Sequence, residues 1–233
     1  MKKLFFCIFI YVHLCKLAYN QDDNLSVKIK ADVYSLHLWR GFANGNSPSI
    51  QPYAEFNIKK LNMGVWAAYA INGSYSEIDF YINYQLKNLK LSLFDYFLPV
   101  TNGKVNSFFD FKKQTTRHAF DFIAEYESDN FPFRFLFSTI FYGDDKHPLT
   151  GNNFYSSYVE IAYKLNALNK KTQFIAAITP YKSYYADKIN FVMAGIKISD
   201  QFKISEKFEL PISVFLMINP YSEKIYFNMG ITL

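Results

Sequence analysis

Residues that commonly carry chemistry are sparse in this chain of 233 residues. Beyond residue 20 its histidines are His37, His118 and His147, and no two of them share the spacing of metal ligands on one face. We therefore expect no metal site. A hydrolase would need a serine beside a histidine with an orienting acid. The pairing of His118 with Ser138 or Ser157 is the one the sequence offers.

That pairing does not favour an enzyme. His118 has the same alternation phase as Phe120 and Phe122, which points it outward near the rim of a sheet. The segment 144–148, Asp-Asp-Lys-His-Pro, is expected to be a solvated acidic turn, with a weak calcium site as the alternative. The chain has no glycine-rich phosphate loop and no nucleic-acid motif. We expect a protein that is not an enzyme, uses no cofactor and binds no nucleic acid.

Charged residues of both signs form the main candidate site. They fall on one face of the expected strands, where they would surround a lumen, and we take nine of them as a cluster: Arg40, Glu55, Asp79, Arg117, Asp121, Glu125, Arg134, Glu160 and Lys164. Arg134 is expected to lie between Asp121 and Glu160. The cluster is either a charged constriction that filters solutes or a salt-bridge network that fills a narrow barrel.

The elements that position these charges are strands. Between residues 76 and 86, Ile78, Phe80 and Ile82 alternate with Glu77 and Asp79, which is the period-2 pattern of an amphipathic strand. The same alternation extends to the last residue, 233. We predict twelve strands, near residues 26–40, 49–60, 62–72, 76–86, 88–98, 116–127, 131–142, 154–166, 171–181, 188–199, 207–219 and 223–233. An even number is typical of transmembrane barrels from bacteria.

The strand faces and connections fit such a barrel. One face of each strand is apolar and suits lipid, whereas the other carries the charges and suits a lumen. Alternate connections are mostly short, and the others include the longest, 41–48, 99–115 and 143–153. Short turns at one end and long loops at the other are the usual asymmetry. Segment 99–115 is the candidate for a loop folded into the lumen.

The N-terminus predicts export. Lys2 and Lys3 precede an apolar run and a small residue, Ala18, which is the pattern of a signal peptide cleaved near residue 20. We therefore predict a signal peptide over 1–20 and one barrel domain over 21–233. The leader holds three of the 25 basic residues, so 22 remain against 20 acidic ones, and the net charge of +5 is no argument for nucleic acid.

Several motifs resemble a known group of proteins. They are Leu38–Gly41 (Leu-Trp-Arg-Gly), Ser47–Pro52 (Ser-Pro-Ser-Ile-Gln-Pro), Gly64–Tyr69, Glu77–Tyr81 and Asp95–Pro99. These stretches resemble a family of Bacteroidetes outer-membrane proteins, distantly similar to the TorF-like porins. The resemblance implies a barrel in the outer membrane and a porin role, without catalytic residues or a known substrate.

Taken together, these observations predict an all-β fold, a transmembrane antiparallel up-and-down barrel of about twelve strands in the outer membrane. We expect a porin or narrow channel for small solutes, and the alternative is a non-conducting structural or surface-interaction barrel. Expected partners are outer-membrane lipid and lipopolysaccharide, the barrel-assembly machinery through the C-terminal strand, and small solutes. Within the cluster, Arg40 is expected to be a rim arginine paired with Asp79 or Asp95.

Overall fold

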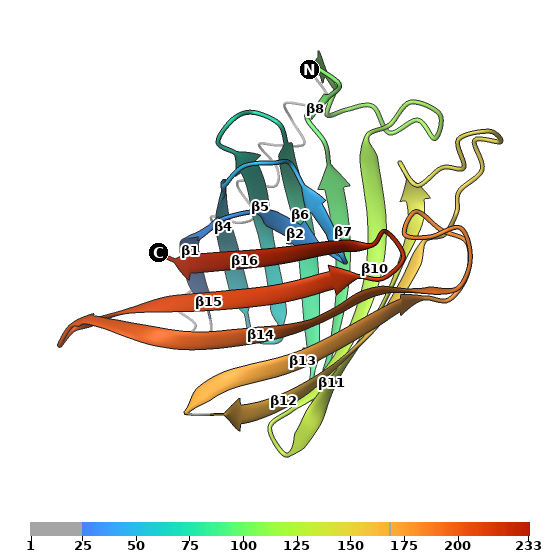
Figure 1. Cartoon of the computed structure of the whole chain (residues 1–233). Coiled ribbons are helices and arrows are strands. Elements are labelled where there is room, and N and C mark those ends of the chain that lie inside the picture. Colours follow the sequence, from blue (N-terminus) through green and yellow to red (C-terminus); the bar gives the residue numbers. More distant parts are fainter. Residues whose placement is uncertain (1–24, 168) are drawn as a thin grey trace.

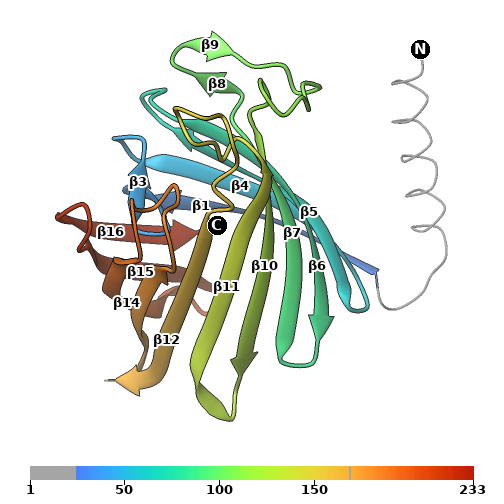
Figure 2. The same cartoon turned by 90° about the vertical axis from the view of Figure 1, so that its right-hand side faces the viewer.

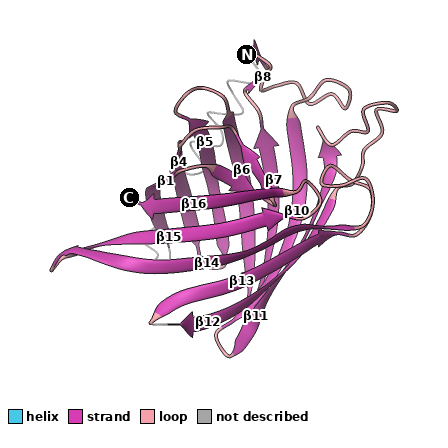
Figure 3. Ribbon diagram, in the orientation of Figure 1, coloured by secondary structure: helices cyan, strands magenta, loops and turns pink. Residues whose placement is uncertain are grey.

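The computed structural model describes residues 25–167 and 169–233, so the predicted signal peptide lies outside the described residues. Within that part of the chain the secondary structure is strand, without helix (Figure 3). Consistently, those residues contain no helix long and apolar enough to cross a membrane. Twelve strands form one closed antiparallel barrel in chain order, with the last strand beside the first (Figure 1). The predicted fold class is confirmed.

The barrel strands are β1 (Leu25–Tyr34), β4 (Ser49–Ile58), β5 (Leu61–Ala70), β6 (Ser76–Leu86), β7 (Leu89–Phe97), β10 (His118–Ser128), β11 (Phe131–Gly143), β12 (Ser157–Ala167), β13 (Lys170–Thr179), β14 (Asn190–Ser205), β15 (Phe208–Asn219) and β16 (Lys224–Thr232). Two small hairpins lie outside the barrel ladder: β2 (His37–Trp39) with β3 (Phe42–Asn44), and β8 (Val100–Thr101) with β9 (Lys104–Val105).

The two ends of the barrel differ. At one end, called here the turn end, the connections 59–60, 87–88, 129–130 and 206–207 each have two residues. At the other, the loop end, the connections are 35–48, 71–75, 98–117, 144–156, 180–189 and 220–223. Lys59 and Lys87 adopt positive φ in their turns, as tight hairpin turns require. The predicted asymmetry of the connections is confirmed.

The side chains of the barrel strands point outward or inward as the apolar–polar alternation predicts. Apolar side chains on the outside include Phe80, Ile161 and Phe227, and all of them are exposed. The buried polar side chains Asp79, Asp121 and Asn228 occupy the opposite phase, inside the barrel. The arrangement is the reverse of a water-soluble barrel, which buries its apolar residues.

The seam between the first and last strands is short. β1 pairs with β4 over ten residues but with β16 over only three, from Asp32 opposite Thr232 to Tyr34 opposite Gly230. Tyr34 packs on Gly230, because a β-carbon added there would lie 2.1 Å from the Tyr34 ring. The β14–β15 hairpin extends past the other strands at the turn end (Figure 1). The predicted turn at 200–206 is therefore wrong at its start, because β14 continues to Ser205.

The long connection 98–117 does not enter the lumen. It stands at the loop end with the β8–β9 hairpin (Figure 2), and its Phe108 contacts outward-facing Phe80 and Phe97. The candidate inward loop therefore lies outside the lumen, because Phe108 and Phe111 pack on outward-facing aromatic rings of the wall. The segment that does fold inward is the β2–β3 hairpin, which the sequence assigned partly to the first strand.

Candidate functional site: the barrel lumen

The β2–β3 hairpin reverses direction at Arg40 and Gly41. Both residues have positive φ, +45° and +91°, the signature of a two-residue hairpin turn that glycine fits best. A β-carbon on Gly41 would lie 2.1 Å from the Val192 carbonyl oxygen. The Asn219 side-chain amide also donates a hydrogen bond of 3.1 Å to the Gly41 carbonyl. The hairpin tip is therefore in direct backbone contact with the wall formed by β14 and β15.

Arg40 holds this hairpin to the opposite wall. Its guanidinium donates to the Asp121 carboxylate at 2.5 Å and to the Tyr185 hydroxyl at 2.6 Å. Tyr96 donates to the same Asp121 oxygen at 3.0 Å. The arginine side chain is 8% exposed and the Asp121 side chain is fully buried. Charge-assisted hydrogen bonds of this kind are about twice as strong as neutral ones. We call the Arg40–Asp121 pair the latch.

Aromatic rings seal the space around the latch. The guanidinium carbon of Arg40 lies 4.7 Å from the Trp39 ring centre and 5.3 Å from that of Tyr158. Trp39 and Phe42 both contact Tyr185, which comes from connection 180–189. Burial raises the pKa of the Tyr185 hydroxyl above its usual value, so this group stays protonated. The hairpin and this connection thus close the loop end of the lumen.

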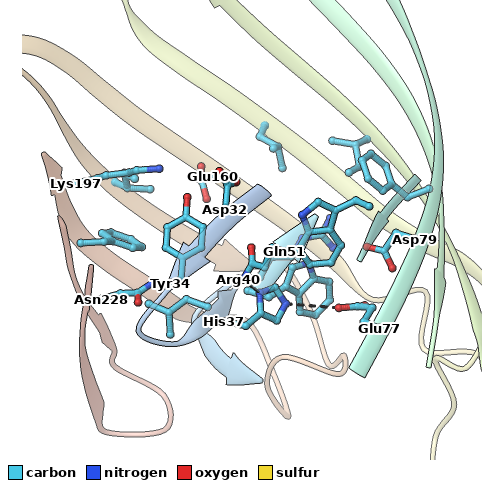
Figure 4. Close-up of a pocket in the computed structure, with 18 of the residues that line it drawn as sticks. Asp32, Tyr34, His37, Arg40, Gln51, Glu77, Asp79, Glu160, Lys197 and Asn228 are labelled. Atoms are coloured by element: carbon cyan, nitrogen blue, oxygen red, sulfur yellow. Dashed lines mark hydrogen bonds and ion pairs between the residues drawn. The ribbon is translucent and has the colours of Figure 1, made fainter. Parts of the chain in front are cut away.

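His37 anchors the start of the hairpin. Its ring contacts Trp66 and stacks on Tyr75, with ring centres 5.3 and 5.7 Å apart. Nδ1 of His37 lies 3.1 Å from the Gln51 amide, and Nε2 lies 3.5 Å from Glu77. Figure 4 shows His37 directed toward Glu77. The hairpin is therefore attached to the β4–β6 wall as well as to the latch.

A second group of charges lies farther from the loop end. Arg134 donates to Glu125 at 2.8 Å and also to Glu160. Glu125 additionally pairs with Lys90 at 2.6 Å, and the Tyr158 hydroxyl donates to Glu160 at 2.5 Å. Every carboxylate in this network has a cationic partner within the wall.

This network corrects one expectation, because Asp121 is not a partner of Arg134. Glu125 and Glu160 both lie opposite Leu136 in the ladders of β10, β11 and β12, so they share one row with it. Asp121 is four residues from Glu125, a displacement of about 13 Å along the strand, and lies opposite Ile140. That distance separates the latch from the Arg134 network.

The other predicted cluster residues are dispersed. Arg117 pairs with Asp144 at 2.8 Å at the loop end, whereas Lys164 pairs with Glu127 at 3.0 Å toward the turn end. Glu55 accepts a hydrogen bond of 3.1 Å from Tyr81. Arg40 is not a rim residue paired with Asp79 or Asp95, because the hairpin carries it inward to Asp121.

The lumen contains a cavity of about 740 Å³ below the hairpin. Arg40, Glu55, Asp79, Arg134 and Glu160 of the predicted cluster line it. Figure 4 shows Arg40, Asp79 and Glu160 around the cavity. A second cavity of about 360 Å³ adjoins it toward the turn end, and the two share Tyr34, Lys197 and Ser213. The lumen thus holds two adjoining cavities, and the hairpin packs across it at the loop end.

Several lining residues escaped the sequence analysis, including Trp39, Gln51 and Lys197. Gln51 and Lys197 lie at inward-facing positions of their strands, like the predicted charges, so the alternation could have identified them. Nothing in the pattern could have found Trp39, because its position depends on the hairpin.

The outward position predicted for His118 is confirmed, and it forms a buried dyad. Nδ1 lies 2.8 Å from Asp95, and Nε2 lies 2.7 Å from the Phe108 carbonyl oxygen. The ring stacks between Phe97 and Phe111. Both nitrogens face acceptors rather than a serine, so the dyad attaches connection 98–117 to the barrel.

Asp145 is not part of a solvated turn as expected. It is buried and accepts hydrogen bonds from the Ser156 backbone at 2.8 Å and hydroxyl at 2.6 Å. Burial raises the pKa of its carboxyl. The described residues contain no group of three side chains placed to hold a metal ion.

Comparisons with known proteins add little to this geometry. No protein-family model and no characterised sequence matches the chain. Among solved structures, the chain is similar to OccAB3 from Acinetobacter baumannii, with 11% identity and a TM-score of 0.39. The match covers 91% of this chain and 65% of that one. No match supports the Bacteroidetes or TorF-like resemblance, which stays a hypothesis.

Proposed function

We propose that the chain is an outer-membrane β-barrel that forms a narrow channel for small solutes, closed in the described conformation by its own hairpin. The observation that carries the proposal is the reversed distribution of side chains. Large apolar residues cover the outside, and charged residues line the inside. Contiguous apolar surface on this scale marks contact with lipid or protein, and alternation of apolar-out and polar-in is the pattern of transmembrane barrels.

The difference in connection length between the two ends supports one orientation of the barrel in the membrane. Two-residue turns lie on the periplasmic side of such barrels and longer loops on the outer side. We therefore place the turn end in the periplasm and the latch near the cell surface. In this orientation the outer wall contacts lipid and lipopolysaccharide, and the C-terminal strand β16 is the element that the assembly machinery would bind.

The seated hairpin sets the channel behaviour. With Trp39, Arg40 and Phe42 packed on the wall, passage through the loop end requires the hairpin to move. The same observation favours the alternative, a structural barrel that does not conduct. The two functions differ in whether the hairpin can move away from the barrel wall.

Two experiments test the proposal in sequence. The folded protein should require detergent for extraction and should migrate faster on a gel unheated than boiled. Release by osmotic shock would contradict the membrane location. Purified barrels in a planar bilayer should then show rare small openings, and a variant with 37–44 replaced by a short Gly-Ser linker should conduct steadily. Absence of current from both proteins over many insertions would leave the structural barrel as the function.

A further inference from the structure

Asp79 is a buried carboxylate in the wall of the lumen cavity, and the acidic residues Glu77 and Asp95 lie near it. It projects inward from β6, opposite Trp66 on β5 and Tyr96 on β7. The residue is 4% exposed, and its Oδ1 atom has no hydrogen-bond partner in the protein. Burial of an unpaired carboxylate costs several kcal/mol in general, and orphaned buried groups call for an explanation. The Oδ1 atom is itself inaccessible, so a positive ligand in the cavity would stabilise this carboxylate through its charge and not by direct contact with that atom.

The charges that line the cavity also favour a positively charged ligand. Five acidic residues line it: Asp32, Glu55, Glu77, Asp79 and Glu160. The basic lining residues are Arg40, Arg134 and Lys197. Both arginines are already engaged, Arg40 with Asp121 and Arg134 with Glu125 and Glu160. The cavity wall therefore carries an excess of negative charge.

Aromatic faces surround this carboxylate. Tyr81 stacks on Phe94 with ring centres 5.3 Å apart, and Phe94 stacks on Tyr96 at 5.6 Å. Trp66 flanks Asp79 on the other side, and Trp39 of the hairpin meets Tyr96 edge-on at 5.8 Å. The faces of such rings attract ammonium ions, most strongly where water is excluded.

We propose that the lumen cavity binds a small organic ammonium ion, held by the charge of Asp79 and the rings of Trp66 and Tyr96. An inorganic cation fits less well, since the described residues offer no three-ligand group. The volume of about 740 Å³ suits a small molecule. The inference rests on the proposed function, because the solute must enter the lumen from the turn end.

The chain supplies its own reporters for a binding test. Its two tryptophans, Trp39 and Trp66, both line the cavity. The folded barrel in detergent would be titrated with choline and with neohexyl alcohol, which has the same shape without the charge. Tryptophan fluorescence should change saturably with choline, with an affinity about tenfold above that for the alcohol. Equal affinities, or no saturable change with choline, would overturn the inference.

Matched variants locate the site. Asp79→Asn should lower choline affinity about tenfold and leave the alcohol unaffected. Glu209→Gln makes the same charge change at an exposed position of β15 outside the cavity lining and should bind choline like the wild type. Unchanged binding by Asp79→Asn would refute the assignment. If that variant does not fold, Trp66→Leu tests the same site through Trp39 fluorescence.

Binding in detergent is independent of conduction. A barrel that conducts but does not bind choline would contradict this inference alone. A barrel that binds choline and never conducts would contradict the channel and leave the site in place.

Discussion

Removal of Arg40 should open the barrel, and the structure gives the size of the effect. Breaking a buried ion pair by deleting one partner costs about 3–5 kcal/mol, because the other charge stays buried and unpaired. In Arg40→Ala that charge is Asp121, whose side chain is fully buried. Displacement of the hairpin would expose Asp121 to the lumen and relieve the cost. At 1.4 kcal/mol for each tenfold change, the open population should rise by about 100-fold or more.

Arg117→Ala is the matched control. Arg117 pairs with Asp144 at 2.8 Å, but its side chain is 41% exposed. Exposed pairs contribute about 0–1 kcal/mol, so this variant should change the open population less than about fivefold. The two substitutions delete the same side chain, but the Arg117 pair is exposed and lies outside the hairpin.

Single-channel recording in planar bilayers measures the open probability directly. In a double-mutant cycle, Asp121→Asn should already raise it, and Arg40→Ala added to Asp121→Asn should raise it far less than in the wild type, because the two residues share one interaction. Equal open probabilities for Arg40→Ala and Arg117→Ala, with both proteins folded, would refute the latch.

Three further predictions follow from the wall and the outer loop. Phe227→Asp puts a charge on the outer face and should reduce assembly measured by gel mobility, since a lipid-facing charge at mid-membrane costs about 2–4 kcal/mol for Lys or Arg and less for Asp. Asn228→Asp should assemble normally, because its Oδ1 atom already accepts bonds from the Ser35 hydroxyl and the Leu36 amide, and equal yields would show that the facing assignment is wrong. Arg134→Ala removes one positive charge and leaves Glu160 without a cationic partner, whereas Glu125 keeps Lys90; it should shift the reversal potential of any current toward cation selectivity, and an unchanged potential would place the network away from the ion path. His118→Phe loses the bond to the Phe108 carbonyl of the outer connection and should speed tryptic cleavage within 98–117 about fivefold, given about 1 kcal/mol for one such bond; cleavage at the wild-type rate would show that stacking alone holds the loop.

Alternation alone predicts the barrel wall well. Strand 76–86 has the predicted bounds, and most others differ by one to three residues at each end. The alternation predicts the strands correctly because a shift of one residue would move every side chain of a strand to the wrong face. The predicted strand 188–199 ends too early, because β14 continues to Ser205. Beyond the apolar belt a strand can carry charge on either face, so the pattern gives no signal there.

The lumen contents were not predictable in the same way. The alternation of residues 26–40 blurs between Tyr34 and Trp39, but a bulge within one strand would also explain that, so the hairpin was absorbed into one long first strand. Only Arg40 and Gly41 signalled a turn, and a turn does not indicate whether a segment points inward. The pairing of Arg40 with Asp121 joins positions 81 residues apart, and mixed charges on one face allow many such pairings.

The hairpin also constrains the order in which the barrel is made. It follows β1 directly, yet it is held by Asp121, Tyr185 and Asn219, which enter the chain 81, 145 and 178 residues later. Contacts of such long sequence separation form late, because the intervening chain must be ordered first. The hairpin therefore cannot make its contacts with the barrel wall until strands β10 to β15 have been added. The contacts of Arg40 thus form only when the barrel wall is nearly complete. A barrel whose assembly stopped before β15 would keep an open lumen.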